Sequence, residues 1–208
     1  MKEFYTISKN ETAEIIEKKS KFIADIYPVR NVEEAENKIK EIKKKYYDAK
    51  HHCIAYRIVE EDRIIEKSSD DGEPSGTAGA PMLNILSKME ITNVLVIVTR
   101  YFGGILLGTG GLVKAYSNST KLALEKAEIS MLEEGFVYKL ELNYSDLENF
   151  KYFMKNNEIK ILKEEYFENV KLSIFVPKNK IDCLNSNNIN EFNITNMKKE
   201  EKTHTKNP

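Results

Sequence analysis

The glycines of this chain gather in one stretch that could bind an anion. Five of the nine fall within nine positions, namely Gly103, Gly104, Gly108, Gly110 and Gly111. An apolar run of strand length precedes the stretch, and apolar residues at helical spacing follow it. A glycine-rich loop that ends at a helix N-terminus presents backbone N–H groups and the positive end of the helix dipole, which suit a phosphate. The alternative is a tight strand-to-helix corner that binds nothing.

Basic and aromatic residues flank this glycine stretch. Arg100 precedes it, followed directly by Tyr101 and Phe102, and Lys114 is expected in the first turn of the helix that follows. A guanidinium beside aromatic rings suits phosphate contact combined with stacking on a nucleobase. Because neighbouring strand residues face opposite sides, Tyr101 cannot share one task with both Arg100 and Phe102. In the alternative, an aromatic ring fills the core, Arg100 pairs with an upstream aspartate, and Lys114 is ordinary surface.

A second glycine-containing stretch, upstream of the first, is acidic. Asp70, Asp71 and Glu73 place three carboxylates within four residues. Such oxygen ligands suit Mg²⁺, and one of the three could act as a general base. The alternative is structural, because a loop with three glycines and two prolines uses acidic residues in its turns and at the following helix cap.

Two adjacent histidines, His51 and His52, precede Cys53. On a strand, at most one of the two imidazoles can face a given site. A zinc centre would need further ligands from elsewhere in the chain, so we predict no metal site here. We expect one imidazole to bond to the acidic loop, in a structural or a catalytic role, and His52 is the catalytic candidate.

Charge and composition limit the classes of function. The chain has 208 residues with 32 basic and 33 acidic side chains, and residues 1–130 carry 20 of each. Nucleic-acid binding would therefore need a local basic patch. Cys53 and Cys183 lie far apart and form no disulfide or metal pattern. No signal peptide and no apolar run of about 18 residues occurs, so we expect a cytoplasmic protein without a membrane partner.

Hydrophobic periodicity predicts two domains with a boundary between residues 130 and 135. The first domain, residues 1–130, is expected to hold strands at 3–7, 12–17, 20–28, 51–59, 63–67 and 93–98, with a turn at Glu61 and Asp62. Its helices are expected after Asn31 as N-cap, from about Gly76 to Lys88, and after the glycine stretch.

The second domain, residues 135–200, follows a different pattern. Strands at 136–143, 159–167, 169–176 and 190–197, a helix capped by Ser145 with Glu148 completing a capping box, and a short helix at 179–185 are expected. This order is β-α-β-β-α-β, the split βαβ layout of ferredoxin-like domains. The charged end from Lys198 is expected to be disordered, with 201–208 as a tail.

Three motifs in this order resemble the YigZ/IMPACT family: HHCIAYR at 51–57, SDDGEPSGTAG at 69–79, and TRYFGG at 99–104 followed by further glycines. The motifs cover residues 1–130, and the layout resembles the bacterial YigZ type over nearly the whole chain. Thr109 stands where the family often has Ala, and Lys114 where it often has Arg, which keeps the character of the site. Ala80 stands where many members have a basic residue, which removes one phosphate contact.

The resemblance implies an α+β chain of two domains. The N-terminal domain would have the fold of the second domain of ribosomal protein S-five, which also occurs in kinases of the galactokinase–mevalonate kinase type. The C-terminal ferredoxin-like domain would be similar to domain five of elongation factor G.

For function, the resemblance implies a translation-associated regulator. Eukaryotic members regulate translation initiation, and binding of RNA or the ribosome is proposed for bacterial members by analogy of fold. On this first hypothesis Arg100, Lys114 and the glycines would contact phosphate, an aromatic ring would stack on a base, and no cofactor is needed.

Two other hypotheses stay open at this point. In one, the chain is an enzyme for a small phosphorylated or nucleotide substrate, with Mg²⁺ or a general base supplied by the carboxylates, although no established activity is implied. In the other, it is a protein–protein adaptor whose acidic loop meets a basic partner.

Overall fold

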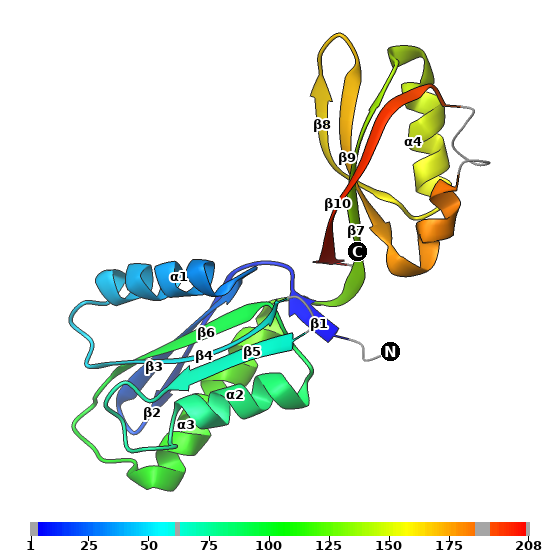
Figure 1. Cartoon of the computed structure of the whole chain (residues 1–208). Coiled ribbons are helices and arrows are strands. Elements are labelled where there is room, and N and C mark those ends of the chain that lie inside the picture. The colour runs from blue at the N-terminus through cyan, green and yellow to red at the C-terminus, as the bar shows by residue number, and fades with distance from the viewer. Residues whose placement is uncertain (1–3, 61–62, 186–191, 207–208) are drawn as a thin grey trace. The chain divides into compact units, whose positions relative to one another are not determined.

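The structure, a computed structural model, describes residues 4–60, 63–185 and 192–206 (Figure 1). The chain divides into two compact units between Met131 and Leu132. Both units combine helices with an antiparallel sheet, so the expected two-domain α+β architecture is confirmed. In the part of the chain that is described, no helix has the length and apolar character needed to cross a membrane.

The first unit is built on a five-stranded antiparallel sheet. Its spatial order is β2-β3-β6-β4-β5. The turn expected at Glu61 and Asp62 lies outside the described residues. The strands run over Glu11–Glu17 (β2), Ser20–Pro28 (β3), Val94–Tyr101 (β6), His51–Glu60 (β4) and Arg63–Ser69 (β5).

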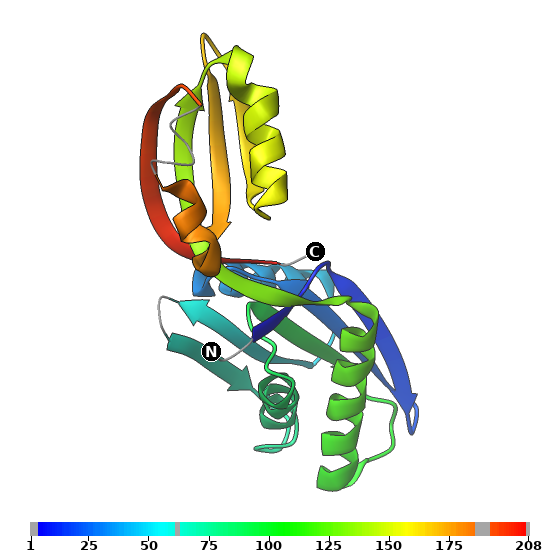
Figure 2. The same cartoon turned by 90° about the vertical axis from the view of Figure 1, so that its right-hand side faces the viewer.

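The central strand β6 is covered on both faces (Figures 1 and 2). Leu95 and Ile97 pack in a cluster with α1 (Val32–Lys45), whereas Val96 and Val98 pack with α2 (Gly79–Lys88) and α3 (Gly108–Lys126). A strand buried on both faces is continuously apolar rather than alternating, which is why residues 93–98 could be predicted as a buried strand. The polar end of β6, which carries Arg100, reaches the edge of this core.

Side-chain acceptors mark the starts of α1 and α2. Helix α1 begins as predicted, because the Asn31 side chain accepts a hydrogen bond from the Glu34 N–H at 2.8 Å. Helix α2 begins at Gly79 rather than at about Gly76. The Asp70 carboxylate accepts from the N–H groups of Gly76 (2.8 Å), Ala78 (3.0 Å) and Gly79 (2.8 Å), so an aspartate remote in sequence caps this helix.

We expect Asp70→Ala to lower the free energy of unfolding by about 1–2 kcal/mol at neutral pH, because the start of α2 loses its cap. Partial burial acts to raise the pKa of Asp70, but its three backbone donors outweigh burial and hold that pKa below its usual value. The cap is therefore fully formed above the unfolded-state pKa of about 4. Its contribution is lost as pH falls through the lower folded-state pKa.

The measurement is urea denaturation of both proteins from neutral pH to acid. The difference in stability between wild type and Asp70→Ala should shrink as the carboxylate becomes protonated. Asp146→Ala is the matched control, because Asp146 occupies the N-cap position of α4 (Leu147–Asn156) but makes no side-chain cap bond there, its carboxylate accepting only an exposed bond from Asn193 among the described residues. A difference that stays constant into strong acid would show that the Asp70 charge does not stabilise α2.

The second unit has the predicted ferredoxin-like order. Strand β9 lies between β8 and β7, and β10 pairs with β7, with antiparallel pairing throughout these strands. The short strand β1 (Phe4–Ile7) belongs to the first unit, as does the start of β7, with which it pairs. The elements are β7 (Ile129–Leu142), a 3₁₀ turn (Tyr144–Asp146), α4 (Leu147–Asn156), β8 (Lys160–Tyr166), β9 (Val170–Pro177), a 3₁₀ helix (Lys178–Leu184) and β10 (Ile194–Lys206).

Two predictions for this unit are wrong. Ser145 does not cap α4 in a box with Glu148, because Ser145 lies inside the 3₁₀ turn and Asp146 is the N-cap. The expected disorder from Lys198, including the tail at 201–208, is also contradicted. Strand β10 continues to Lys206, opposite Leu132. The unpaired edge of the long strand β7 supplies backbone partners, and that pairing outweighs the polar composition; residues 207–208 lie outside the description.

Candidate functional site

A cavity of about 420 Å³ lies where the glycine stretch leads from β6 into α3. Its size is that of a small-molecule site. Two of its apolar wall residues, Phe102 and Leu106, are large side chains that remain 53% and 81% exposed. The apolar part of the wall is formed by Pro74, Phe102, Leu106, Leu107 and Leu112.

One wall of the cavity is the N-terminus of α3, where Gly108 and Thr109 lie. Gly108 enters the helix with φ +75°, and a methyl group added at Gly108 or Gly110 would meet no atom within 4 Å. No side chain of the described residues caps this helix, and its first turn contains no acidic residue. The first N–H groups of α3 and the positive end of its dipole therefore have room for an anion.

The floor of the cavity is a buried ion pair. Glu73 Oε1 accepts from Arg100 Nη1 at 2.7 Å and from the Tyr116 hydroxyl at 2.8 Å. The side chains of Glu73 and Arg100 are only 3% and 6% exposed. Arg100 Nη2 also donates to Ser20 Oγ at 3.2 Å, and its guanidinium lies 5.3 Å from the centre of the Phe22 ring. Arg100 thus pairs with the acidic stretch, through Glu73 rather than through an aspartate.

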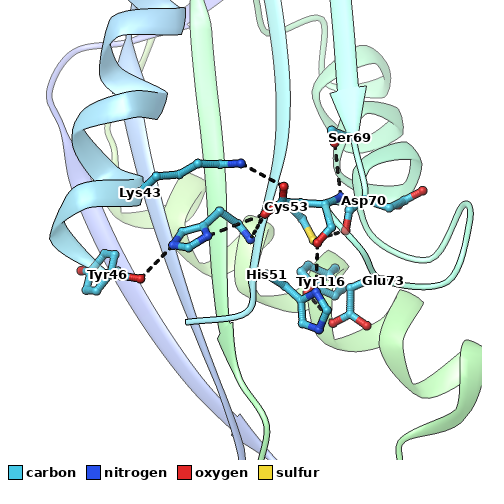
Figure 3. Close-up of polar contacts among 10 residues, drawn as sticks. Lys43, Tyr46, His51, Cys53, Ser69, Asp70, Glu73 and Tyr116 are labelled. Atoms are coloured by element: carbon cyan, nitrogen blue, oxygen red, sulfur yellow. Dashed lines mark hydrogen bonds and ion pairs between the residues drawn. The ribbon is translucent and has the colours of Figure 1, made fainter. Parts of the chain in front are cut away.

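The other two carboxylates of the acidic stretch serve the local structure. Asp70 caps α2, as described above. Asp71 accepts from Lys43 Nζ at 2.9 Å and from the His52 backbone N–H at 2.7 Å. Figure 3 shows Lys43 and Tyr46 on one side of these contacts and Glu73 and Tyr116 on the other. Among the described residues, no group of three or more His, Cys, Asp or Glu side chains could hold a metal ion.

His52 and Tyr101, both predicted site residues, do not line the cavity. The His52 ring is on the α1 side of β4, where Nε2 lies 3.0 Å from the Tyr46 carbonyl oxygen. Tyr101 donates its hydroxyl proton to Asp48 at 2.7 Å and does not line the cavity. Strand alternation puts the neighbouring imidazole, that of His51, at the cavity instead.

Cys53 lies beneath the acidic stretch in the core. Its Sγ donates to the Asp70 carbonyl oxygen at 3.0 Å. Burial raises the pKa of the thiol to about 12. Because the thiolate is the reactive form, Cys53 is not suited to act as a nucleophile near neutral pH.

The predicted phosphate-binding residues are partly rearranged. Gly103 approaches the β2–β3 turn so closely that a Cβ would lie 2.0 Å from the backbone carbon of Lys19. Its role in this packing excludes any side chain. Because α3 already begins at Gly108, Lys114 falls in the second turn rather than the first, and it does not line the cavity. It follows Gly110 by four residues, on the same helical face. Gly104 lies in the loop before α3, and Gly111 lies in the first turn of α3.

Sequence reasoning missed Lys50, Lys18 and Lys19, of which the first lines the cavity and the other two lie in the turn that packs against Gly103. Lys50 is the cavity residue, whereas the Lys19 backbone packs against Gly103 and Lys18 precedes it in the β2–β3 turn. We call Lys18, Lys19, Lys50 and Lys114 the lysine rim. All four are exposed, and within the described ranges none of them makes an ion pair. Only the hairpin pairing, which is set by tertiary structure, reveals that Lys18 and Lys19 belong here.

Comparison with known proteins identifies the family. The Impact N-terminal domain matches residues 18–124, and a domain of unknown function (DUF1949) matches residues 140–186. The chain is 36% identical over 173 residues to the IMPACT family member YvyE of Bacillus subtilis, covering 83% of this chain and 79% of YvyE. It is 36% identical over 165 residues to the IMPACT family member YigZ of Escherichia coli, covering 79% and 81% of the two chains.

A solved structure supports the same conclusion. A protein described as hypothetical shares 32% identity with this chain at a TM-score of 0.66, covering 92% of this chain and 93% of its own. The cavity residues, from Lys50 to Leu112, all lie in the segment that matches the Impact N-terminal domain. The chain therefore belongs to the IMPACT family.

Proposed function

We propose that this chain is a translation-associated regulator that binds RNA, free or exposed on the ribosome, at the lysine rim and the cavity beside it. The observation that carries the proposal is the start of α3, which no described side chain caps and which lines one cavity together with Lys50. Lys18, Lys19 and Lys114 are exposed on the β2–β3 turn and on α3, and within the described ranges none of them makes an ion pair. Membership of the IMPACT family supports the translational part, in line with the role that the resemblance implies.

The local charge supports a polyanion as the ligand. The whole chain has a formal net charge of −1, so bulk charge attracts no nucleic acid. Around the cavity the balance is different, because Glu73 is neutralised by Arg100 whereas the lysine rim has no such partners among the described residues. Lysines of this kind bind phosphates and release counterions. The first N–H groups of α3 add a directed phosphate site.

The exposed apolar side chains favour a single strand over a duplex. Phe102 is half exposed beside the Arg100 guanidinium, whose centre lies 5.5 Å from the ring centre. Aromatic rings next to cations form platforms on which unpaired bases stack. Base pairing would hide the faces of the bases from Phe102, so loops and single-stranded ends are the expected targets.

The two other hypotheses draw less support. A magnesium-dependent enzyme would need carboxylates directed at one point, but Asp70 and Asp71 are occupied by backbone and lysine donors. The same contacts weaken the adaptor hypothesis, because the acidic loop directs its charge inward. Glu73 is the one carboxylate of the three that reaches the cavity.

The test is the affinity of the full chain for a labelled single-stranded RNA and for purified ribosomes as a function of salt. Each phosphate contact to a single strand contributes about −0.7 to the slope of log K against log salt. Contacts from the lysine rim should therefore give a slope of about −2 to −3 between about 50 and 200 mM salt.

A pair of charge-matched variants locates the contact. Lys50→Gln with Lys114→Gln should reduce the magnitude of the slope by about 1.4, because two phosphate contacts are lost. Lys121→Gln with Lys126→Gln, in the second half of α3, removes the same charge and should leave the slope nearly unchanged. Absence of RNA and ribosome binding at low salt would refute the proposal.

A further inference from the structure

The carboxylate on the floor of the cavity has two oxygens in unlike surroundings. Glu73 Oε1 receives both Arg100 Nη1 and the Tyr116 hydroxyl. Oε2 receives no hydrogen bond from any described residue, although the side chain is 3% exposed and lines the cavity. Arg100 Nε is buried and has no partner in the described part of the chain, so this N–H group could donate to an acceptor atom. Oε2 can accept hydrogen bonds but receives none from the described residues, so the floor offers the cavity an acceptor to which a ligand can donate.

The remaining walls restrict what that ligand can be. Phe102 and Leu106 offer exposed apolar surface against which a flat ring can lie. The start of α3, with Gly108 and Thr109, lines the same cavity and presents the backbone N–H groups that suit an anion. A ligand that matches the Glu73 floor, the apolar surface and the start of α3 has a hydrogen-bond donor on one edge, a planar body and an attached phosphate. A nucleotide has these features, and a phosphate alone would leave Glu73 Oε2 without a donor.

We propose that the cavity selects the base of one nucleotide of the bound RNA through Glu73 Oε2, with guanine preferred and uracil disfavoured. This inference rests on the proposed RNA binding. Guanine presents two adjacent donors, N1–H and N2–H, on its Watson–Crick edge, and a carboxylate accepts well from such groups. Adenine and cytosine each offer one amino group, which can also donate a hydrogen bond to a carboxylate. Uracil offers a single N–H between two carbonyl oxygens, and these oxygens would face the negative carboxylate.

The experiment compares RNA hexamers of equal length and charge. A hexamer of uridines is the reference, and a second hexamer carries one guanosine at an internal position. Phosphate contacts are the same in both, so any difference in affinity reports on the base. We expect the guanosine to tighten binding about tenfold, and inosine at the same position, which lacks the 2-amino group, to lose part of that gain.

The variant Glu73→Gln is expected to weaken or reverse the preference for the guanosine-containing hexamer. The glutamine oxygen can still accept from Arg100 and Tyr116, which turns the amide NH₂ group toward the cavity. An amide donor favours the carbonyl oxygens of uracil, so the preference between the two hexamers should shrink or invert. If this variant does not fold, the inosine comparison on the wild-type chain tests the same point.

The outcomes separate the two proposals. Salt-dependent binding of both hexamers with equal affinity would overturn base selection and leave RNA binding intact. A preference that Glu73→Gln, shown to be folded by circular dichroism, leaves unchanged would also overturn it. No binding of either hexamer or of ribosomes would refute the proposed function itself.

Discussion

Replacing Arg100 by alanine is expected to lower the free energy of unfolding of the first unit by about 3–5 kcal/mol. The Glu73 carboxylate would remain in the core with only the Tyr116 hydroxyl as a donor, since its other bond comes from Arg100 at 2.7 Å. A buried charge that loses its partner cannot recover its hydration. Ser20 and the Phe22 ring would also lose the guanidinium that they contact.

The measurement is urea denaturation of the full chain, with hydrogen exchange of the β3, β4 and β6 amides used to assign the transition of the first unit. Tyr116→Phe is the graded comparison, because it removes one hydrogen bond to Glu73 and should cost about 1–2 kcal/mol. Lys121→Ala removes an exposed cation and should change stability by less than about 0.5 kcal/mol. An effect of Arg100→Ala as small as that of Lys121→Ala would contradict the buried ion pair.

A double variant tests the origin of the loss. Arg100→Ala combined with Glu73→Ala removes both charges and leaves neither uncompensated. The combined loss should therefore be smaller than the sum of the two single losses, by about 1–3 kcal/mol for groups in direct contact. If the losses simply add, the cost comes from packing around each side chain. Because of this structural role, loss of RNA binding in Arg100→Ala would not by itself identify a phosphate contact.

The surroundings of Arg100 include features that could be predicted from the sequence and others that could not. The buried strand, the glycine stretch and the following helix could be predicted, because local periodicity and glycine spacing determine them. Which of three neighbouring carboxylates meets Arg100 could not be predicted. That choice depends on Asp70 capping α2 and on Asp71 reaching the His52 backbone, two contacts made only in the folded chain.

The same distinction applies to the residues around the cavity. Strand alternation correctly separates Tyr101 from Phe102 and His51 from His52, but it cannot say which member of each pair faces the cavity. The lysine rim depends on the β2–β3 hairpin lying against Gly103, a contact between segments some 80 residues apart, as in the Ser20–Gly103 hydrogen bond. In the second unit, the pairing of Lys198 with Lys139 extends β10 where composition alone predicts disorder.

Thr109→Glu is expected to weaken RNA binding at least tenfold while leaving the fold intact. Thr109 is exposed in the first turn of α3 and lines the cavity. A carboxylate there complements the helix dipole, so stability should be unchanged or raised by about 0.3–1 kcal/mol. The same carboxylate occupies the positive end of the helix and repels a phosphate that would bind there. Opposite effects on stability and affinity would distinguish lost recognition from damage to the fold.

Asn118→Glu is the matched control for this variant. It adds the same charge at an exposed position of the same helix, nine residues further on. Nine residues correspond to about 13 Å along the axis and about half a turn around it. This separation exceeds the Debye length of about 8 Å at physiological salt, so RNA affinity should change less than twofold. The measurement is an anisotropy titration of the labelled RNA hexamer with both variants. Equal losses of affinity would mean that only the overall charge matters. No loss of affinity with Thr109→Glu would place the phosphate away from α3.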